Sequence, residues 1–289
     1  MDGMLNSPYR HIEAHRIAGS LGAEITGVNL AEEMPPEVLA EVRQALLDHL
    51  VIFFRDQDMT PDRLLRFARN WGEIHRHPYI AGMADHPDVL ELNKKASDKR
   101  NFGGDWHTDQ MFAPRPAMGT ILWAKQVPKA GGDTLFANMY LAYETLSPGM
   151  KSLIADVRGM CVGDKKKSGA TRAAVNAATI SMTTLEPPPG MPRVSAHPLV
   201  RTHPETGSKS LYIGGHVHYL ENMTREESAP LVDYLYAHAV RPEFTCRFRW
   251  EPGSLAFWDN RCTQHFAIND YPAETRIMHR VTVRGDEPF

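Results

Sequence analysis

The sequence predicts a mainly β fold with flanking helices (α+β), and two observations carry this prediction. Short segments in which apolar and polar residues alternate, typical of half-buried strands, recur over most of the 289 residues. Patterns with helical spacing occur mainly near the N-terminus and between strands. We find no internal repeat and no low-complexity linker. We therefore expect one β domain, residues 1–289, decorated with helices.

The N-terminal part combines short strands with two helices. Pro35-Pro36 is a suitable helix start, and apolar residues such as Val38 and Val42 follow at helical spacing. Thr60-Pro61 provides an N-cap and a first-turn proline for the second helix. The expected elements are a strand over 23–28, a helix over 37–50, a strand over 51–54 and a helix from Thr60 towards Trp71.

From Gly119 onward the pattern is mainly β. Gly131-Gly132 and residues 204–207 mark turns between strand-like segments. Glu226-Glu227 suits the first turn of a helix, because carboxylates there interact favourably with the helix dipole. The expected elements are strands over 121–124, 134–136, 157–162, 244–250, 255–258 and 276–284, a hairpin over 199–212, and helices over 138–144 and 224–238.

Residues 163–195 differ from their surroundings. They contain Lys165-Lys166-Lys167, a stretch of small residues and Pro187-Pro188-Pro189-Gly190. Loops of this length inside compact domains are usually functional or disordered. We interpret the segment as a lid or insertion, whereas the lysine run by itself indicates a solvated face.

Composition and charge narrow the classes of function. The formal net charge is -3, which provides no overall basic field for nucleic acid. No stretch approaches the ~20 uninterrupted apolar residues of a membrane span, and residues 1–16 lack the apolar segment of a secretory signal. The three cysteines are widely spaced and form no metal or disulfide pattern. We expect a soluble cytoplasmic protein that binds neither nucleic acid nor membrane.

Trp106-His107-Thr108-Asp109, with Gln264-His265 far downstream, is the most informative motif. Two histidines and one carboxylate can form a facial triad, which holds non-haem Fe(II) on one face and leaves the opposite positions open. If the segment is a strand, His107 and Asp109 point to the same side. The triplet alone is weak, because 14 His and 35 acidic residues produce such triplets by chance. Two polar strand residues near a turn are the alternative interpretation.

The last expected strand places Arg276 and Arg280 on one face. If Ile277 and Val281 pack outward against helices, both guanidinium groups point into the β domain, about 13 Å apart at ~3.3 Å per residue. A guanidinium in an apolar interior is costly unless it is paired, and it suits bidentate binding of carboxylate or sulfonate. Two inward arginines beside an iron site indicate a dicarboxylate co-substrate and the acidic end of a substrate. The alternatives are pairing with internal acids, or an edge strand that faces water.

Five segments of the chain occur together in one known family. They are Trp106-His107-Thr108-Asp109, Gly131-Gly132-Asp133-Thr134-Leu135, Val200-Arg201-Thr202-His203-Pro204, Trp258-Asp259-Asn260-Arg261 with Thr263-Gln264-His265, and Arg276-Ile277-Met278-His279-Arg280. From about residue 11 to the C-terminus, in family order and near-family spacing, the chain resembles the taurine dioxygenase family of Fe(II)/2-oxoglutarate-dependent oxygenases. The resemblance implies a double-stranded β-helix (jelly-roll) core.

The resemblance also implies roles for individual residues. His107, Asp109 and His265 match the catalytic iron ligands of the family. Thr134 and Arg276 match the residues that hold the distal carboxylate of 2-oxoglutarate. The cofactors implied are therefore Fe(II), 2-oxoglutarate as co-substrate, and O2.

The expected reaction is hydroxylation of a C–H bond of a small anionic substrate, with succinate and CO2 as co-products. Arg280, and His77 in His77-Pro78, match the residues that bind the sulfonate in taurine-cleaving members of the family. The substrate is then a sulfonate such as taurine, or a carboxylate or phosphonate analogue. The alternative is a non-catalytic or differently metallated jelly-roll protein that binds small organic acids. We further expect a homo-oligomer, a dimer or a tetramer.

The chain departs from the taurine-cleaving pattern around the substrate. Residues 101–105 replace an Asn-rich stretch, and Ile80 stands where the family has a tyrosine. Residues 214–218 occupy the position of a pocket phenylalanine, so His216 and His218 are candidate pocket residues. These departures leave iron and 2-oxoglutarate binding intact but put taurine itself in doubt.

Overall fold

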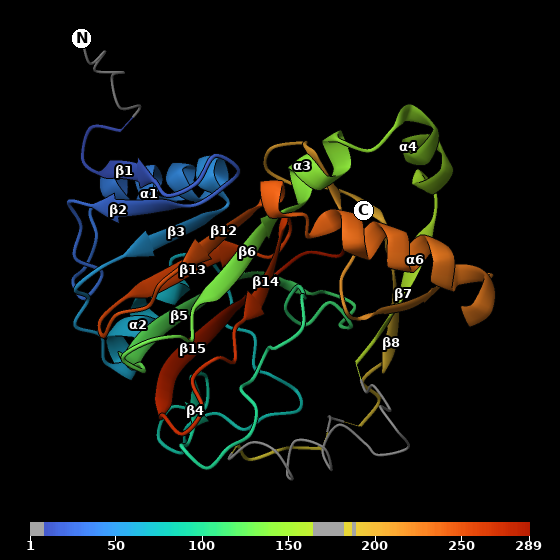
Figure 1. Ribbon diagram of the computed structural model, residues 1–289. Coiled ribbons are helices and arrows are strands. Elements are labelled where there is room, and N and C mark those ends of the chain that lie inside the picture. Colours follow the sequence, from blue (N-terminus) through green and yellow to red (C-terminus); the bar gives the residue numbers. More distant parts are fainter. Residues whose placement is uncertain (1–8, 164–181, 187–188) are drawn as a thin grey trace.

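Two facing β-sheets form the centre of the structure, a computed structural model that describes residues 9–163, 182–186 and 189–289 (Figure 1). The larger sheet has seven strands in the order β1-β2-β3-β13-β5-β15-β4. Its strands pair in antiparallel fashion, except that β2 and β3 are parallel. The bounds are β1 Glu13–Arg16, β2 Ala23–Thr26, β3 Val51–Phe54, β4 Leu90–Lys94, β5 Ala117–Gln126, β13 Leu255–Asp259 and β15 Arg276–Arg284.

A three-stranded antiparallel sheet, β12-β6-β14, packs against the inner face of the larger sheet. The rings of Phe53 and Phe248 are stacked with centroids 4.0 Å apart. Phe136 meets Trp258 edge-on, with centroids 5.4 Å apart. Aromatic contacts of this kind add to the burial energy between sheets. The bounds are β6 Thr134–Asn138, β12 Thr245–Phe248 and β14 Thr263–Ala267.

Side chains that alternate along β13 contribute to two different apolar cores, one under the helices and one between the two sheets. Leu255 and Phe257 of β13 pack with the helices on the outer side, whereas Ala256 and Trp258 face the space between the sheets. Two helices cover the outer face, α1 (Pro36–His49) and α2 (Pro61–Arg69), and Figure 1 shows both on that side. The inner face of β13, β5 and β15 is therefore the face that can carry a site.

The other half of the molecule surrounds a further three-stranded sheet in the order β11-β7-β8. Figure 1 places this half on the side away from α1 and α2. The last helix begins with a capping box, in which Thr224 and Glu227 satisfy each other's backbone N–H groups. The bounds are α3 Met139–Glu144, α4 Pro148–Ile154, β7 Arg158–Val162, β8 Val194–Pro198, β9 Val200–Thr202, β10 Lys209–Leu211, β11 Val217–Leu220, α6 Arg225–Ala239 and η1 Pro242–Phe244.

The helices expected from the sequence are present within two residues of their expected bounds. Thr60 caps α2 by accepting a hydrogen bond from the backbone N–H of Arg63, and Asn138 caps α3 in the same way. Seven elements of the described residues were not expected: β1, β4, α4, β8, β11, η1 and β14. Most of the expected lid, 163–195, lies outside the described residues. Among the helices that the structure describes, none is long and apolar enough to cross a bilayer.

Candidate active site

His107 and Asp109 do not lie on a regular strand, so the strand alternation expected for them is wrong. His107 forms an isolated antiparallel bridge with His265, with N–H to O distances of 3.1 and 2.9 Å in the two directions. Asp109 lies in the turn that follows. The side chains nevertheless converge, because the bridge fixes the backbone of His107 against β14 and the turn directs Asp109 back towards both imidazoles.

The three side chains form a compact donor set. One ligand atom from each of His107, Asp109 and His265 lies within 4.8 Å of the others. Oδ1 of Asp109 is 3.6 Å from Nε2 of His107 and 3.8 Å from Nε2 of His265. Nδ1 of His107 lies 2.6 Å from the carbonyl oxygen of Asp105, which leaves Nε2 directed at the carboxylate. Two imidazole nitrogens and one carboxylate oxygen are the donors that non-haem Fe(II) takes.

A buried polar network holds the other oxygen of Asp109. The hydroxyl of Thr120, on the inner face of β5, donates to Oδ2 of Asp109 at 2.7 Å. Asn260 donates to that hydroxyl at 2.9 Å, and its Oδ1 accepts from the backbone N–H of Asp109 at 3.2 Å and from the indole of Trp258 at 3.1 Å. Thr120 and Asn260 are fully buried. The network leaves Oδ1 facing the imidazoles.

Electrostatics keep the donor set in its metal-binding protonation state. Burial alone would raise the pKa of Asp109, but the charge of Arg280 and the neighbouring imidazoles hold that pKa well below its usual range. Burial lowers the pKa of His265 well below its usual value, and His107 adds to this shift against the opposing charge of Asp109. At neutral pH the carboxylate is ionised and the His265 ring is neutral, the forms that bind a metal ion.

Arg276 and Arg280 of β15 face inward, as expected from alternation. Together with Thr134, His107 and His265 they line a cavity of about 30 Å³ between the sheets. Nη2 of Arg280 is 2.8 Å from Oδ1 of Asp109, in an ion pair that lacks the angles of a hydrogen bond. The alternative of an edge strand that faces water is wrong for both arginines, since both are buried. The alternative of pairing with an internal acid holds for Arg280, which pairs with Asp109.

Arg276 carries buried hydrogen-bond donors that the described residues do not satisfy. Its Nε and Nη2 have no hydrogen-bond partner there, and burial lowers the pKa of the guanidinium. Thr134, across the cavity, accepts a hydrogen bond at 2.9 Å from the indole of Trp250. A buried guanidinium with orphan donors is strained unless an anion binds it. The geometry therefore fits the carboxylate of a co-substrate.

His77 lies at a second and larger cavity rather than at the small one. That cavity has a volume of about 790 Å³. Nδ1 of His77 accepts a hydrogen bond from the backbone N–H of Tyr79 at 3.1 Å. A row of rings connects it with the donor set, in the order His77, Tyr79, Phe112, His216 and His107, and neighbouring centroids are 5.3 to 6.4 Å apart. His216 is buried beside His107, whereas His218 is half-buried on β11.

Known proteins resemble this chain over nearly its whole length. The family described as "Taurine catabolism dioxygenase TauD, TfdA family" matches residues 13–282. An alkylsulfatase from Acinetobacter baylyi is 31% identical, covering 99% of this chain and 89% of that protein. An alpha-ketoglutarate-dependent sulfate ester dioxygenase from Pseudomonas putida is 32% identical, covering 96% and 91%. The crystal structure of a taurine dioxygenase from Burkholderia xenovorans has a TM-score of 0.79 at 35% identity, covering 96% of this chain and 91% of that one.

The fold and the similarity to known proteins agree on the class of protein, a jelly-roll dioxygenase that depends on Fe(II) and 2-oxoglutarate. Within this class, the chain belongs to the taurine catabolism dioxygenase TauD, TfdA family. The family, the jelly-roll fold and the oxidoreductase class expected from the sequence are thereby confirmed.

Two polar residues of the site were not singled out from the sequence. Asn260 lies within a segment that matched the family, but the match gave it no role. Thr120 is an ordinary threonine of an apolar strand, and no local signal distinguishes it. Both residues act through contacts between segments that are distant in the chain.

Proposed function

We propose that the protein hydroxylates a C–H bond of a small anionic substrate, with His107, Asp109 and His265 as its iron ligands. The convergence of these three donors beside two buried arginines supports the assignment most directly. When bound, Fe(II) and 2-oxoglutarate supply the oxidation by O2, which also yields succinate and CO2. The chain itself binds, orients and shields the reactants.

Thr134 and Arg276 are the proposed site for the distal carboxylate of 2-oxoglutarate. The orphan Nε and Nη2 of Arg276 present two parallel donors to it, the arrangement that suits a carboxylate. Burial of this guanidinium excludes competing water and strengthens the interaction. We therefore expect Arg276→Gln to weaken 2-oxoglutarate binding.

Arg280 is the proposed contact for the anionic group of the substrate. Its 2.8 Å approach to Asp109 means that an anion on this arginine lies beside the donor set. His77 is a proposed second contact, at the outer end of the row of rings. Held in this way, the substrate presents a C–H bond close to its anionic end to the oxidant.

The remainder of the substrate is proposed to be apolar. Tyr79, Ile80, Leu90 and Phe112 form a buried apolar cluster, with Phe102 packed against it. None of these side chains carries a negative charge that would pair with the ammonium group of taurine. The sulfate ester dioxygenase from Pseudomonas putida, which is 32% identical to this chain, agrees with this chemistry. We therefore favour an alkyl sulfate ester or alkyl sulfonate over taurine.

A substrate panel tests this function. We expect hexyl sulfate or hexane-1-sulfonate to stimulate Fe(II)- and O2-dependent succinate formation more strongly than taurine does. His265→Ala should abolish succinate formation, whereas His49→Ala, at the end of α1, should retain it. If the protein binds the metal but no acid in the panel stimulates succinate formation, the non-catalytic alternative would be favoured.

Arg280→Gln separates the two arginines. We expect the apparent KM for the anionic substrate to rise about 10- to 100-fold, since a hydrogen bond to a charged group contributes about 1.5–3 kcal/mol. The KM for 2-oxoglutarate should change much less, and the exposed Arg241→Gln serves as the control. Loss of 2-oxoglutarate affinity with unchanged substrate affinity would show that the two arginines are assigned the wrong way round.

We also propose that the enzyme works in the cytoplasm and forms a homo-oligomer, a dimer or a tetramer. Three free, buried cysteines suit a reducing compartment. Light scattering on the purified protein tests the oligomer, since a monomer at all concentrations would exclude it.

A further inference from the structure

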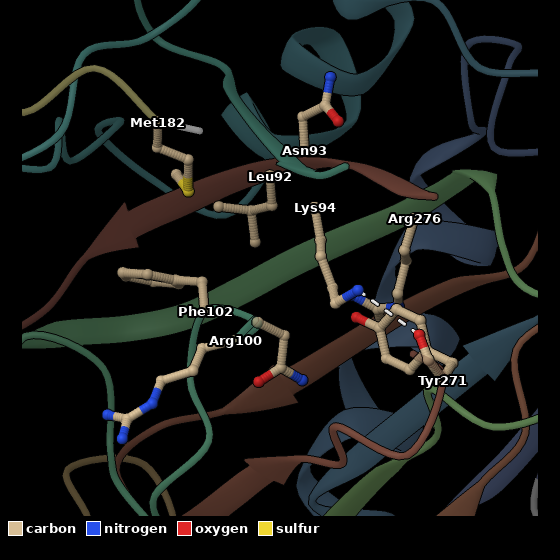
Figure 2. Close-up of a pocket in the computed structure, with 9 residues that line it drawn as sticks. Leu92, Asn93, Lys94, Arg100, Phe102, Met182, Tyr271 and Arg276 are labelled. Carbon is tan, nitrogen blue, oxygen red and sulfur yellow. Dashed lines mark hydrogen bonds between the residues drawn. The ribbon is translucent and has the colours of Figure 1, made fainter. Parts of the chain in front are cut away.

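A second buried cation lies opposite Arg276. Lys94, the last residue of β4, is the register partner of Arg276 in the antiparallel β4–β15 pair. Both residues are 6% exposed, and both line a small cavity beside the active site (Figure 2). Directly opposed residues in an antiparallel pair project on the same face, with Cβ atoms about 5 Å apart. Two positive charges are thus buried side by side.

Two other pairs in the β4–β15 register are chemically matched. Met278 faces Leu92, and His279 faces Glu91, with His279 Nε2 at 3.4 Å from the carboxylate. Like charges directly opposite each other are destabilising, and burial increases the repulsion. Lys94 and Arg276 are therefore the pair that calls for a compensating negative charge.

The described residues do not supply that charge. Lys94 Nζ donates to the carbonyl oxygens of Tyr271 and Glu274, both at a long 3.4 Å, and lies 4.6 Å from the centre of the Tyr271 ring (Figure 2). Asp133 interacts with Arg276 electrostatically, but its carboxylate is already paired with Arg247 at 2.6 Å. Carbonyl groups and ring faces compensate a buried cation only in part.

We propose that Lys94 is a second cation of the co-substrate site, acting with Arg276 on the distal carboxylate of 2-oxoglutarate. The inference rests on the proposed function. The two cavities share Leu92, Phe102 and Arg276, so the guanidinium of Arg276 lies between Lys94 and the donor set. A carboxylate bound to Arg276 therefore lies in the electrostatic field of both cations. Bound carboxylate then relieves the repulsion between the two cations, which makes binding of the co-substrate stronger than Arg276 and Thr134 achieve alone.

Lys94→Met removes the charge and keeps a long, unbranched side chain, and Lys94→Arg keeps the charge. Calorimetric titration of Mn(II)-loaded protein with N-oxalylglycine, a non-reacting analogue of 2-oxoglutarate, measures binding without turnover. We expect Lys94→Met to weaken this binding about 10-fold or more, because it removes one of the two positive charges near the carboxylate. Lys94→Arg should stay within about threefold of the wild type. Lys95→Met, at the exposed neighbour, is the matched control.

Oxalate separates a binding role from a structural one, because it chelates the metal but has no distal carboxylate. Lys94→Met should bind oxalate as the wild type does, and its ligand-free thermal midpoint should not fall, because the cation repulsion is gone. Equal losses of oxalate and N-oxalylglycine affinity, or unchanged N-oxalylglycine affinity, would overturn the proposal.

Two further outcomes locate the cause of a failure. Inorganic sulfate or phosphate could stabilise the wild type but not Lys94→Met, without competing with N-oxalylglycine. That result would show that the cation pair binds a free anion instead of the co-substrate, and it would overturn the proposal. Failure of the wild type itself to bind N-oxalylglycine would instead refute the function on which the proposal rests.

Discussion

Removal of one hydroxyl group, in Thr120→Val, should weaken metal binding without removing a ligand. Valine has nearly the shape of threonine but cannot donate to Asp109. In the wild type this hydrogen bond is 2.7 Å long and fully buried, and Asn260 supports it from the other side at 2.9 Å. The substitution frees Oδ2 of the carboxylate to rotate and leaves an amide donor of Asn260 unsatisfied.

The expected size of the effect follows from these contacts. A hydrogen bond to a charged group contributes about 1.5–3 kcal/mol, and an orphaned buried donor costs about 1–3 kcal/mol. The second loss affects folding, whereas the first affects both folding and the orientation of Asp109. Loss of a residue that orients a ligand typically lowers metal affinity about 10- to 100-fold. We expect a decrease in Fe(II) affinity in this range, accompanied by a lower free energy of unfolding.

Anaerobic competition between the protein and a chromophoric chelator measures Fe(II) affinity, and urea denaturation of metal-free protein measures stability. Thr120→Ser should restore metal affinity, because it keeps the donor. Thr282→Val, at the register partner of Thr120 on β15, removes a buried hydroxyl of the same kind from the neighbouring strand and should leave metal affinity unchanged. Metal affinity within twofold of the wild type in Thr120→Val, or the same loss in Thr282→Val, would refute a positioning role for Thr120.

Three further outcomes test the structure away from the proposed metal ligands. Burial, with Arg284 nearby, lowers the pKa of His75 from 6.5 to about 4. As the pH falls, the unfolded chain therefore takes up a proton at this residue before the folded chain does, and the free energy of unfolding should fall by up to about 3 kcal/mol between pH 6.5 and pH 4. His75→Gln should flatten this part of the pH–stability curve. The three cysteines are buried and burial raises the pKa of each, so a thiol reagent should label none of them until the protein unfolds, and labelling of native protein would contradict their placement. Thr224→Ala breaks the capping box of α6 and should lower the free energy of unfolding by about 1 kcal/mol in urea titrations, with no change expected if the end of the helix frays.

Local patterns in the sequence were sufficient to predict those helices and strands whose own residues determine their conformation. α1 and α2 carry helical spacing and proline starts. β15 alternates over nine residues, so the shared face of Arg276 and Arg280 followed from periodicity, whereas their inward direction remained conditional on how the strand packs. β4 was not expected, because Leu-Glu-Leu-Asn-Lys is short and half polar. Its strand conformation results from pairing with β15, which is a long-range contact.

The donor set likewise combines features that the local sequence predicts with features that depend on long-range contacts. The residue types and the family segments predicted His107, Asp109 and His265 as the donor set, but their orientation was attributed to a strand that is absent. The bridge between His107 and His265 and the support of Asp109 by Asn260 join segments far apart in the chain. Register between distant strands also places Lys94 against Arg276. Such pairings depend on the folded topology rather than on local sequence.

His107, Asp109 and His265 are expected to bind Fe(II) in a site that 2-oxoglutarate completes. The most direct measurement adds 2-oxoglutarate to anaerobic Fe(II)-loaded protein and records the visible charge-transfer absorption that a chelating 2-oxo acid gives to Fe(II). It requires no knowledge of the substrate. We expect this absorption to saturate at one equivalent of iron and of 2-oxoglutarate in the wild type, and to be absent in His265→Ala. A wild type that binds iron without developing the absorption, or a His265→Ala variant that develops it fully, would contradict the claim.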